Sequence, residues 1–244
     1  MRYLVISDVH ANLEAFDAVL AAAGTCDHVL ALGDFVGYGA DPNAVIDRVR
    51  SLAAVTCIRG NHDKVGSGLE STDGFNQLAR RAIDWTSRQL TGDHREWLTA
   101  LPEGPVVVTD LLEICHGAPF DEDAYIFDDL DATRALQGSS RPVCLFGHTH
   151  VPAAFALSRT DRVLRPLPGT RLDLSTNADT SFLVNCGAVG QPRDGDPRAA
   201  FGILDTADLS LTLVRVAYDV AKAQAKIVAA GLPEVLAHRL GVGR

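Results

Sequence analysis

Side chains suited to metal binding stand in short polar turns, each directly after an apolar run of the sequence. In chain order the turns hold Asp8 and His10, Asp34, Asn61 and His62, His116, and His148 and His150. Five of the eight histidines fall in these turns, whereas His28, His94 and His238 do not. Carboxylate, amide and imidazole groups without cysteine suit Mn²⁺, Fe, Zn²⁺ or similar cations, not a soft metal or a structural zinc site. The sequence therefore predicts a metal site.

Asp34 is the residue around which the other candidates are organised. The apolar run from Val29 to Leu32 precedes it and fits a strand that is covered on both faces. The segment 35–39 that follows is too rich in glycine to continue the strand. Open α/β folds bind their ligands at this end of a parallel strand. We predict that Asp34 bridges two metal ions.

The first quarter of the chain alternates strand and helix. We expect strands at 3–6, 29–34 and 54–58, a helix between Asn12 and Gly24, and a second helix that begins at Asp41 and Pro42. This β-α-β-α-β pattern implies a parallel sheet with right-handed crossovers. The polar turns then lie where the strands of that sheet end.

The remainder of the chain changes to shorter strands with a few helices. We expect helices at 75–90, 94–100, 131–137 and 219–231, a hairpin of 106–108 with 111–115, and strands at 143–146, 153–157, 163–167, 181–185, 200–205 and 209–216. The stretch from Lys64 to Gly74 is polar and rich in Gly and Ser, which predicts a mobile loop beside the site. We expect residues 1–244 to form one domain, with a second sheet packed on the first.

Composition and charge limit the classes of partner. The net charge of −9 and the pI near 5.3 argue against a nucleic-acid or anionic-membrane surface, because both require clustered Lys and Arg. The five cysteines lack CxxC spacing, which favours buried free thiols in a reducing compartment. No stretch resembles a signal peptide or is long enough to span a membrane. We therefore expect a cytoplasmic protein.

The polar turns taken together resemble a known family. The series Asp8-x-His10, Gly33-Asp34, Gly60-Asn61-His62-Asp63, His116 and Gly147-His148-x-His150 is similar to the motifs of the calcineurin-like metallophosphoesterase superfamily. Residues 35–43 and 185–196 further resemble small bacterial members. The resemblance implies an α/β (α+β) fold, a four-layer αββα sandwich of two mixed sheets. It also implies a dinuclear metal site between loops at one edge.

The resemblance also assigns roles to the candidate residues. It places Asp8, His10 and His150 on the first metal, Asn61, His116 and His148 on the second, and Asp34 between the two. The metals would be two divalent ions, with Mn²⁺ the first choice and Fe, Zn, Ni or Co as alternatives. Such a pair activates a bridging hydroxide for in-line attack on phosphorus. His62 would be the acid or hydrogen-bond donor for the leaving oxygen.

Two positions depart from the phosphoprotein phosphatases of this superfamily. Those enzymes follow the bridging Asp with a second Asp and an Arg, where this chain has Gly37 and Tyr38. His62 therefore lacks its usual carboxylate partner, and the loop lacks a phosphate clamp. Arg193 or Arg59 is the candidate replacement for the clamp, and Tyr38 is a candidate wall of the substrate pocket.

The expected activity is that of a phosphodiesterase or nucleotide-type phosphatase on a small phosphoester. The sequence does not rank diester, cyclic-nucleotide, dinucleoside polyphosphate and monoester substrates, and it does not predict an oligomeric state. The alternatives are a phosphoprotein phosphatase, a protein-binding scaffold with weak catalysis, and an iron oxygenase with two His and one carboxylate. Taken singly, Asp8 could merely cap a turn, and Asp63 could either support the site or cap the next segment.

Overall fold

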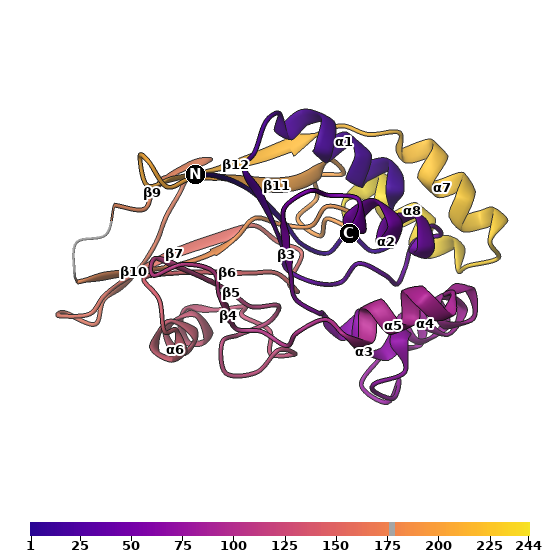
Figure 1. Ribbon diagram of the computed structural model, residues 1–244, viewed down its shortest axis with the longest axis horizontal. Helices are drawn as coiled ribbons and strands as arrows, with labels where there is room; N and C mark the ends of the chain where they lie inside the picture. The colour runs from indigo at the N-terminus through magenta and orange to yellow at the C-terminus, as the bar shows by residue number, and fades with distance from the viewer. Residues whose placement is uncertain (176–178) are drawn as a thin grey trace.

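The computed structural model describes residues 1–175 and 179–244, which form two six-stranded sheets packed face to face (Figure 1). The first sheet contains, in spatial order, β3 (Val55–Cys57), β2 (His28–Ala31), β1 (Arg2–Ile6), β11 (Ala199–Asp205), β12 (Ser210–Val216) and β9 (Arg171–Asp173). The second contains β4 (Val106–Val107), β5 (Leu112–Ile114), β6 (Val143–Phe146), β10 (Thr180–Asn185), β7 (Ala153–Ser158) and β8 (Leu164–Pro166).

Both sheets are mixed, as expected. In the first, β1, β2 and β3 run parallel, and β11 pairs antiparallel with β1. In the second, β5, β6 and β10 run parallel, whereas β4 pairs antiparallel with β5 and β7 pairs antiparallel with β10. The polar turns follow the carboxyl ends of the parallel strands, so they collect at one edge of the two sheets.

Helices cover the outer faces and complete the four layers (Figure 1). On the first sheet lie α1 (Leu13–Ala23) and α2 (Pro42–Arg50), and on the second lies α6 (Asp129–Gly138). Residues of β1 alternate between two cores: Leu4 and Ile6 face α1, whereas Tyr3 and Val5 pack between the sheets. This period of two explains why β1 is apolar on both faces.

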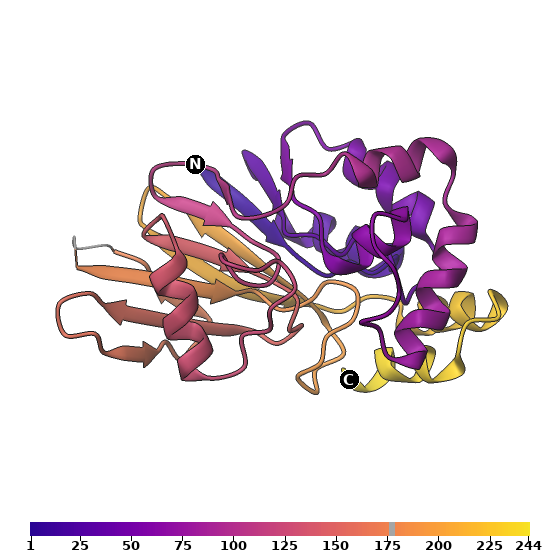
Figure 2. The ribbon, with the colours of Figure 1, turned by 90° about the horizontal axis from the view of Figure 1, so that it is seen from below.

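Five further helices gather at the end of the molecule that carries the polar turns (Figure 2). They are α3 (Asn61–Ser67), α4 (Gln77–Gln89), α5 (Gly92–Thr99), α7 (Val220–Ala229) and α8 (Glu234–Val242). Two expectations need correction here. Lys64 to Ser67, the start of the expected mobile loop, form the last turn of α3. The sequence analysis also missed α8 and the three-residue strand β9.

Two findings concern the chain's other expected properties. All five cysteines are free, and three of them are buried, whereas Cys26 and Cys57 are half-buried. The expectation of buried thiols is therefore wrong for these two. Among the described residues, no helix has the length and apolar character needed to cross a bilayer.

Candidate metal centre

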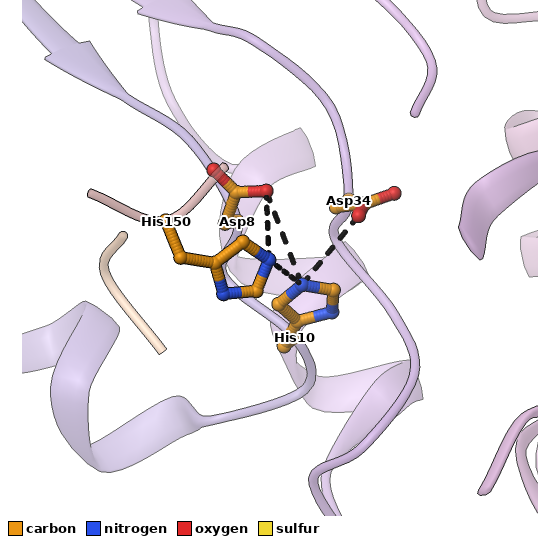
Figure 3. A group of neighbouring side chains, drawn as sticks. All are labelled: Asp8, His10, Asp34 and His150. Atoms are coloured by element: carbon orange, nitrogen blue, oxygen red, sulfur yellow. Dashed lines mark hydrogen bonds and ion pairs between the residues drawn. The ribbon is translucent and has the colours of Figure 1, made fainter. Parts of the chain in front are cut away.

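Four of the predicted ligands converge in one buried group (Figure 3). Asp8 and His10 follow β1, Asp34 follows β2, and His150 follows β6. The Nε2 atoms of His10 and His150 lie 3.1 Å apart. Nε2 of His150 is 3.3 Å from Oδ1 of Asp8, and Nε2 of His10 is 3.5 Å from Oδ2 of Asp34. The first group thus joins loops from both sheets.

A second group shares Asp34 with the first. Nε2 of His116 lies 3.2 Å from Nδ1 of His148 and 3.5 Å from Oδ2 of Asp34. Oδ1 of Asn61, the first residue of α3, lies 3.4 Å from the same His116 nitrogen. The structure therefore brings all seven predicted ligands together. Oδ2 of Asp34 lies 3.5 Å from one imidazole of each group.

Each of the four imidazoles has its second ring nitrogen against a backbone carbonyl. The partners are Val36 O for His10 (2.9 Å), Leu32 O for His116 (2.7 Å), Asp123 O for His148 (3.1 Å) and Gln191 O for His150 (2.6 Å). A carbonyl accepts, so these ring nitrogens must carry the hydrogen. The other nitrogen of each ring then directs a lone pair into the centre.

The atoms around these lone pairs indicate whether cations fit the centre. Two pairs of imidazole nitrogens face each other at 3.1 and 3.2 Å with carboxylate oxygens beside them, and acceptors at such distances repel unless a proton or a cation lies between them. Oδ2 of Asp34 is buried and has no hydrogen-bond partner among the described residues. Two divalent cations would satisfy this oxygen and both imidazole pairs. Nitrogen and oxygen donors without sulfur suit borderline cations such as Mn²⁺.

Burial and charge set the protonation of the groups. Burial lowers the pKa of His10 to about 4 and that of His148 to about 3, so both rings are neutral at pH 7. Burial also lowers the pKa of His116, but Asp34 outweighs it and raises the value to about 10. Burial raises the pKa of Asp34, yet His116, His62 and His10 hold it well below its ordinary value.

The polar turns that carry the candidate ligands have an uncommon backbone conformation. Asp8, His10, Asp34, His148 and His150 all have φ between 48° and 66°, the left-handed region that residues other than glycine rarely adopt. Backbone hydrogen bonds hold these turns in place: Asp8 N donates to Gly33 O and His10 N donates to Asp34 O. Such strain clusters at functional sites, where the surrounding structure fixes it.

Asp63 supports the turn that carries Asp34. Its buried carboxylate accepts hydrogen bonds from the backbone N–H groups of Asp34, Phe35, Val36 and Gly60, at 2.7 to 3.2 Å. The bond from Gly60 N also caps the start of α3. Both interpretations that the sequence left open therefore apply, because one carboxylate caps the helix and fixes the turn.

His62 lies beside the centre but belongs to neither of the two groups of candidate ligands. Its ring packs against the rings of Tyr38, Phe75 and His10, with centroids 4.5 to 4.8 Å apart. Its Nδ1 is buried and has no hydrogen-bond partner within the described chain. A Cβ added at Gly37 would lie 2.3 Å from that nitrogen. The glycine that replaces the expected carboxylate thus makes room for the ring.

A cavity of about 190 Å³ opens onto this part of the site. Asn61, His62 and His148 line its inner side, and Tyr38 and Tyr125 are among its other walls. The ring of Tyr125 stacks on that of His148 at 3.9 Å. A small substrate in this cavity would contact one predicted metal group and His62 together.

The two arginines suggested by the sequence lie in different surroundings. Nη2 of Arg193 lies 3.5 Å from the hydroxyl of Tyr38 and 3.1 Å from Oε1 of Gln191. Arg59 instead pairs with the carboxylates of Glu122 and Glu103. Among the described residues Arg193 therefore has no carboxylate partner, and it contacts Tyr38, a wall of the cavity, whereas the guanidinium of Arg59 is already neutralised.

Sequence reasoning missed the groups that orient the ligands. The carbonyls of Asp123 and Gln191 fix His148 and His150, and backbone atoms carry no mark in a sequence. An ion-pair network around the buried Lys64 holds the Asp123 segment: Nζ of Lys64 lies 2.6 Å from Asp123 and 3.0 Å from Glu122. The charged residues of this network are far apart in the chain, so no pattern in the sequence indicates that they pair.

Comparison with known proteins identifies the class that this fold and centre define. Residues 1–209 match the family model of the calcineurin-like phosphoesterase superfamily domain. The chain belongs to this superfamily of metallophosphoesterases.

Individual relatives extend over nearly the full chain. The uncharacterized protein MJ0912 of Methanocaldococcus jannaschii is 36% identical over 98% of this chain and 97% of its own length. A metallophosphoesterase from Sphaerobacter thermophilus has a crystal structure with a TM-score of 0.86 and 39% identity, covering 100% of this chain and 99% of that one. The hypothetical protein PH1004 from Pyrococcus horikoshii OT3 shares the fold, with a TM-score of 0.79, 20% identity and coverage of 100% and 98%.

Proposed function

We propose that this protein is a metal-dependent phosphoric ester hydrolase for a small substrate, a phosphodiesterase or a nucleotide-type phosphatase. The observation that carries the proposal is the convergence of four inward imidazole nitrogens on the unpartnered Oδ2 of Asp34. Asp8, His10 and His150 would hold one divalent ion, and Asn61, His116 and His148 the other. Mn²⁺ is our first choice, with Fe, Zn, Ni or Co as alternatives.

Two bound cations would supply Lewis-acid activation of the phosphoryl oxygens and of water. The protein's own residues then position the ester. His62 would donate a hydrogen bond or a proton to the leaving oxygen, because its ring lines the cavity next to Asn61. Arg193 would hold a phosphoryl oxygen in place of the clamp missing from the Tyr38 loop.

Several features support a small substrate over a phosphoprotein. The cavity has a volume of only about 190 Å³, and aromatic rings form part of its wall. Gly37 and Tyr38 replace the Asp and Arg of the phosphoprotein phosphatases.

The five free cysteines support a cytoplasmic location. A protein-binding scaffold is the weaker alternative, because every ligand position is filled.

The test uses metal-stripped protein to which Mn²⁺ is restored, with bis-p-nitrophenyl phosphate and p-nitrophenyl phosphate as substrates. We expect turnover that requires Mn²⁺ and falls by about 100-fold in His62→Ala, since a general acid contributes on this order. Asn61→Ala should also lose activity, through weaker metal binding. His238→Ala, an exposed histidine outside the turns, is the matched control and should retain activity.

The outcomes separate the alternatives. Diester turnover favours a phosphodiesterase, and monoester turnover alone favours a phosphomonoesterase. Absence of turnover with Mn²⁺, Fe, Co, Ni and Zn would contradict the proposed enzyme and favour the scaffold.

A further inference from the structure

A second cavity, of about 420 Å³, adjoins the cavity at the metal centre. The two share three wall residues, Tyr38, Asn76 and Tyr125. The remaining residues that line the second cavity are three arginines: Arg193, Arg239 and Arg244. A molecule that extends out of the metal centre past the two tyrosines therefore meets a wall of guanidinium groups.

These arginines lack the carboxylate partners that several other arginines of the described chain have. Arg48, Arg171 and Arg198, for example, each pair with a neighbouring aspartate. No carboxylate of the described residues forms an ion pair with any of the three cavity arginines. Nε of Arg193 is in addition buried without a hydrogen-bond partner among those residues. In a chain with a net charge of −9, three unpaired guanidinium groups at one cavity point to an anionic ligand.

The arginine wall comes from two segments that are fixed to each other. Arg239 lies on α8, whose residues Leu236 and Leu240 are buried in a cluster with Tyr38. The end of this helix is tied to the Arg193 loop, because Gly195 N donates to Gly243 O at 2.9 Å. The cavity is therefore built before any ligand arrives.

The helical hairpin of α7 and α8 lies beyond the residues that match the superfamily model, which end at 209. Lys226 of α7 anchors it through ion pairs with Glu14 and Asp41, both at 2.7 Å. The part of the chain that matches the model thus supplies the candidate metal centre and Arg193, and the segment added after it supplies Arg239 and Arg244. An added element of this kind is suited to select substrates rather than to perform the reaction.

We propose that the second cavity binds a second phosphate group of the substrate. The preferred substrates are then phosphoesters that carry, besides the ester at the metal centre, another phosphate bound by Arg239 and Arg244. Guanidinium groups match phosphate oxygens in geometry and charge, and they form paired hydrogen bonds to them. The aromatic rings of Tyr38 and Tyr125 would contact the part that joins the two phosphates. This inference rests on the proposed function.

The test compares two substrates that differ by one phosphate. They are the p-nitrophenyl ester of thymidine 5′-phosphate and the same ester with an additional 3′-phosphate. With the Mn²⁺-loaded enzyme we expect kcat/KM to be about tenfold higher for the second, a difference that corresponds to one good charged contact. In the double variant Arg239→Gln/Arg244→Gln this ratio should fall to near one, mainly through KM. Arg165→Gln, on the exposed face of β8, is the control and should keep the ratio.

Binding measurements keep the inference testable without turnover. Calorimetry with thymidine 3′,5′-bisphosphate and thymidine 5′-phosphate should show about tenfold tighter binding of the bisphosphate to the unmodified protein, and none of this preference in the double variant. Equal affinity for both nucleotides, or a preference that the double variant keeps, would overturn the second phosphate site. Loss of all hydrolysis with the binding preference intact would instead overturn the proposed function.

Discussion

Packing against neighbouring rings positions His62 beside the candidate metal centre. The expected carboxylate is replaced by Gly37, whose φ is 87°. The ring is held by packing against Tyr38, Phe75 and His10, and its Nδ1 has no partner among the described residues. The space left by the missing Cβ is therefore what allows the ring to occupy this position.

Substitution of Gly37 by alanine should displace His62. The new Cβ would lie 2.3 Å from Nδ1, a distance that requires the ring to move. A shift of about 1 Å in the position of a group that acts on the substrate lowers turnover by about 100-fold. We expect that loss in kcat for bis-p-nitrophenyl phosphate, with Mn²⁺ binding largely retained because the ligand side chains are unchanged.

The matched control is Gly169→Ala. Gly169 also has a positive φ, 99°, but a Cβ there meets nothing within 4 Å. It carries the same kind of backbone strain, about 1 kcal/mol, without the clash. Equal kcat values for the two variants would show that His62 does not depend on the space at Gly37.

The candidate ligands could be selected from the sequence because each stands in a short polar turn that follows an apolar run. Asp34 and His116, for example, mark the ends of buried strands. Arg239 was not predicted, since it stands in a helix that was itself missed and its distance from Arg193 along the chain hides their proximity in the fold. Local sequence patterns indicate the candidate ligands, whereas the second cavity is formed by residues that only the tertiary structure brings together.

At the scale of elements, an ion-pair network ties α3 to the segment that orients His148. Glu122 is buried and pairs with Lys64 at 3.0 Å and with Arg59 at 2.8 Å. The next residue, Asp123, accepts the hydrogen bond of His148 through its carbonyl. The network therefore connects the helix that begins at Asn61 with a predicted ligand from the other sheet.

Glu122→Gln should destabilise the protein in a pH-dependent manner. Burial raises the pKa of Glu122, but hydrogen bonds from Arg59 and Lys64 outweigh it and hold the pKa below its ordinary value of 4.5. A carboxylate with a depressed pKa contributes stability that is present above pH 4.5 and is lost as the pH falls through the folded value. We expect a decrease of about 1 kcal/mol in the free energy of unfolding at pH 7, measured by urea denaturation.

The difference between this variant and the unmodified protein should disappear in acid, since Glu122 is then protonated in both the folded and the unfolded state. Glu96→Gln, at an exposed position, is the control and should be neutral at every pH. A Glu122→Gln penalty that stays constant down to pH 3 would rule out the ion pairs as its cause.

Predictability of the elements follows their length and periodicity. The helices α1, α2 and α4 have regular apolar spacing and were predicted close to their observed bounds. By contrast, α3 is seven residues long, carries polar residues at most positions, and owes its position to Asp63 and to the ion pairs of Lys64. Its stability comes from contacts that a local pattern does not contain.

At the scale of the whole molecule, the proposed cations connect the two sheets. Asp8, Asp34 and Asn61 come from turns of the first sheet, and His116 and His148 from turns of the second. A cation that binds the folded chain and not the unfolded one stabilises it by about 2.7 kcal/mol at a concentration 100 times its Kd. For a chain of this size that corresponds to a rise in Tm of roughly 5–10 °C.

We therefore expect Mn²⁺ to raise Tm by this amount over protein treated with a chelator, as measured by differential scanning calorimetry. Asp34→Asn should lose most of the increase, because Oδ2 contacts both groups of ligands. Asp110→Asn, at an exposed turn, should keep it. A chelator that leaves Tm unchanged in the unmodified protein would contradict a metal link between the sheets.

The strand order of the first sheet has a consequence for synthesis on the ribosome. β1 lies between β2 and β11, yet β11 does not begin until Ala199. At a translation rate of ~5–20 residues per second, about 200 residues take roughly 10–40 s to make. All seven predicted ligands lie within residues 8–150, so they leave the ribosome before β11, the strand that pairs with the second edge of β1. For that interval the nascent chain carries a full set of metal ligands beside an open strand edge, where a second nascent chain could pair.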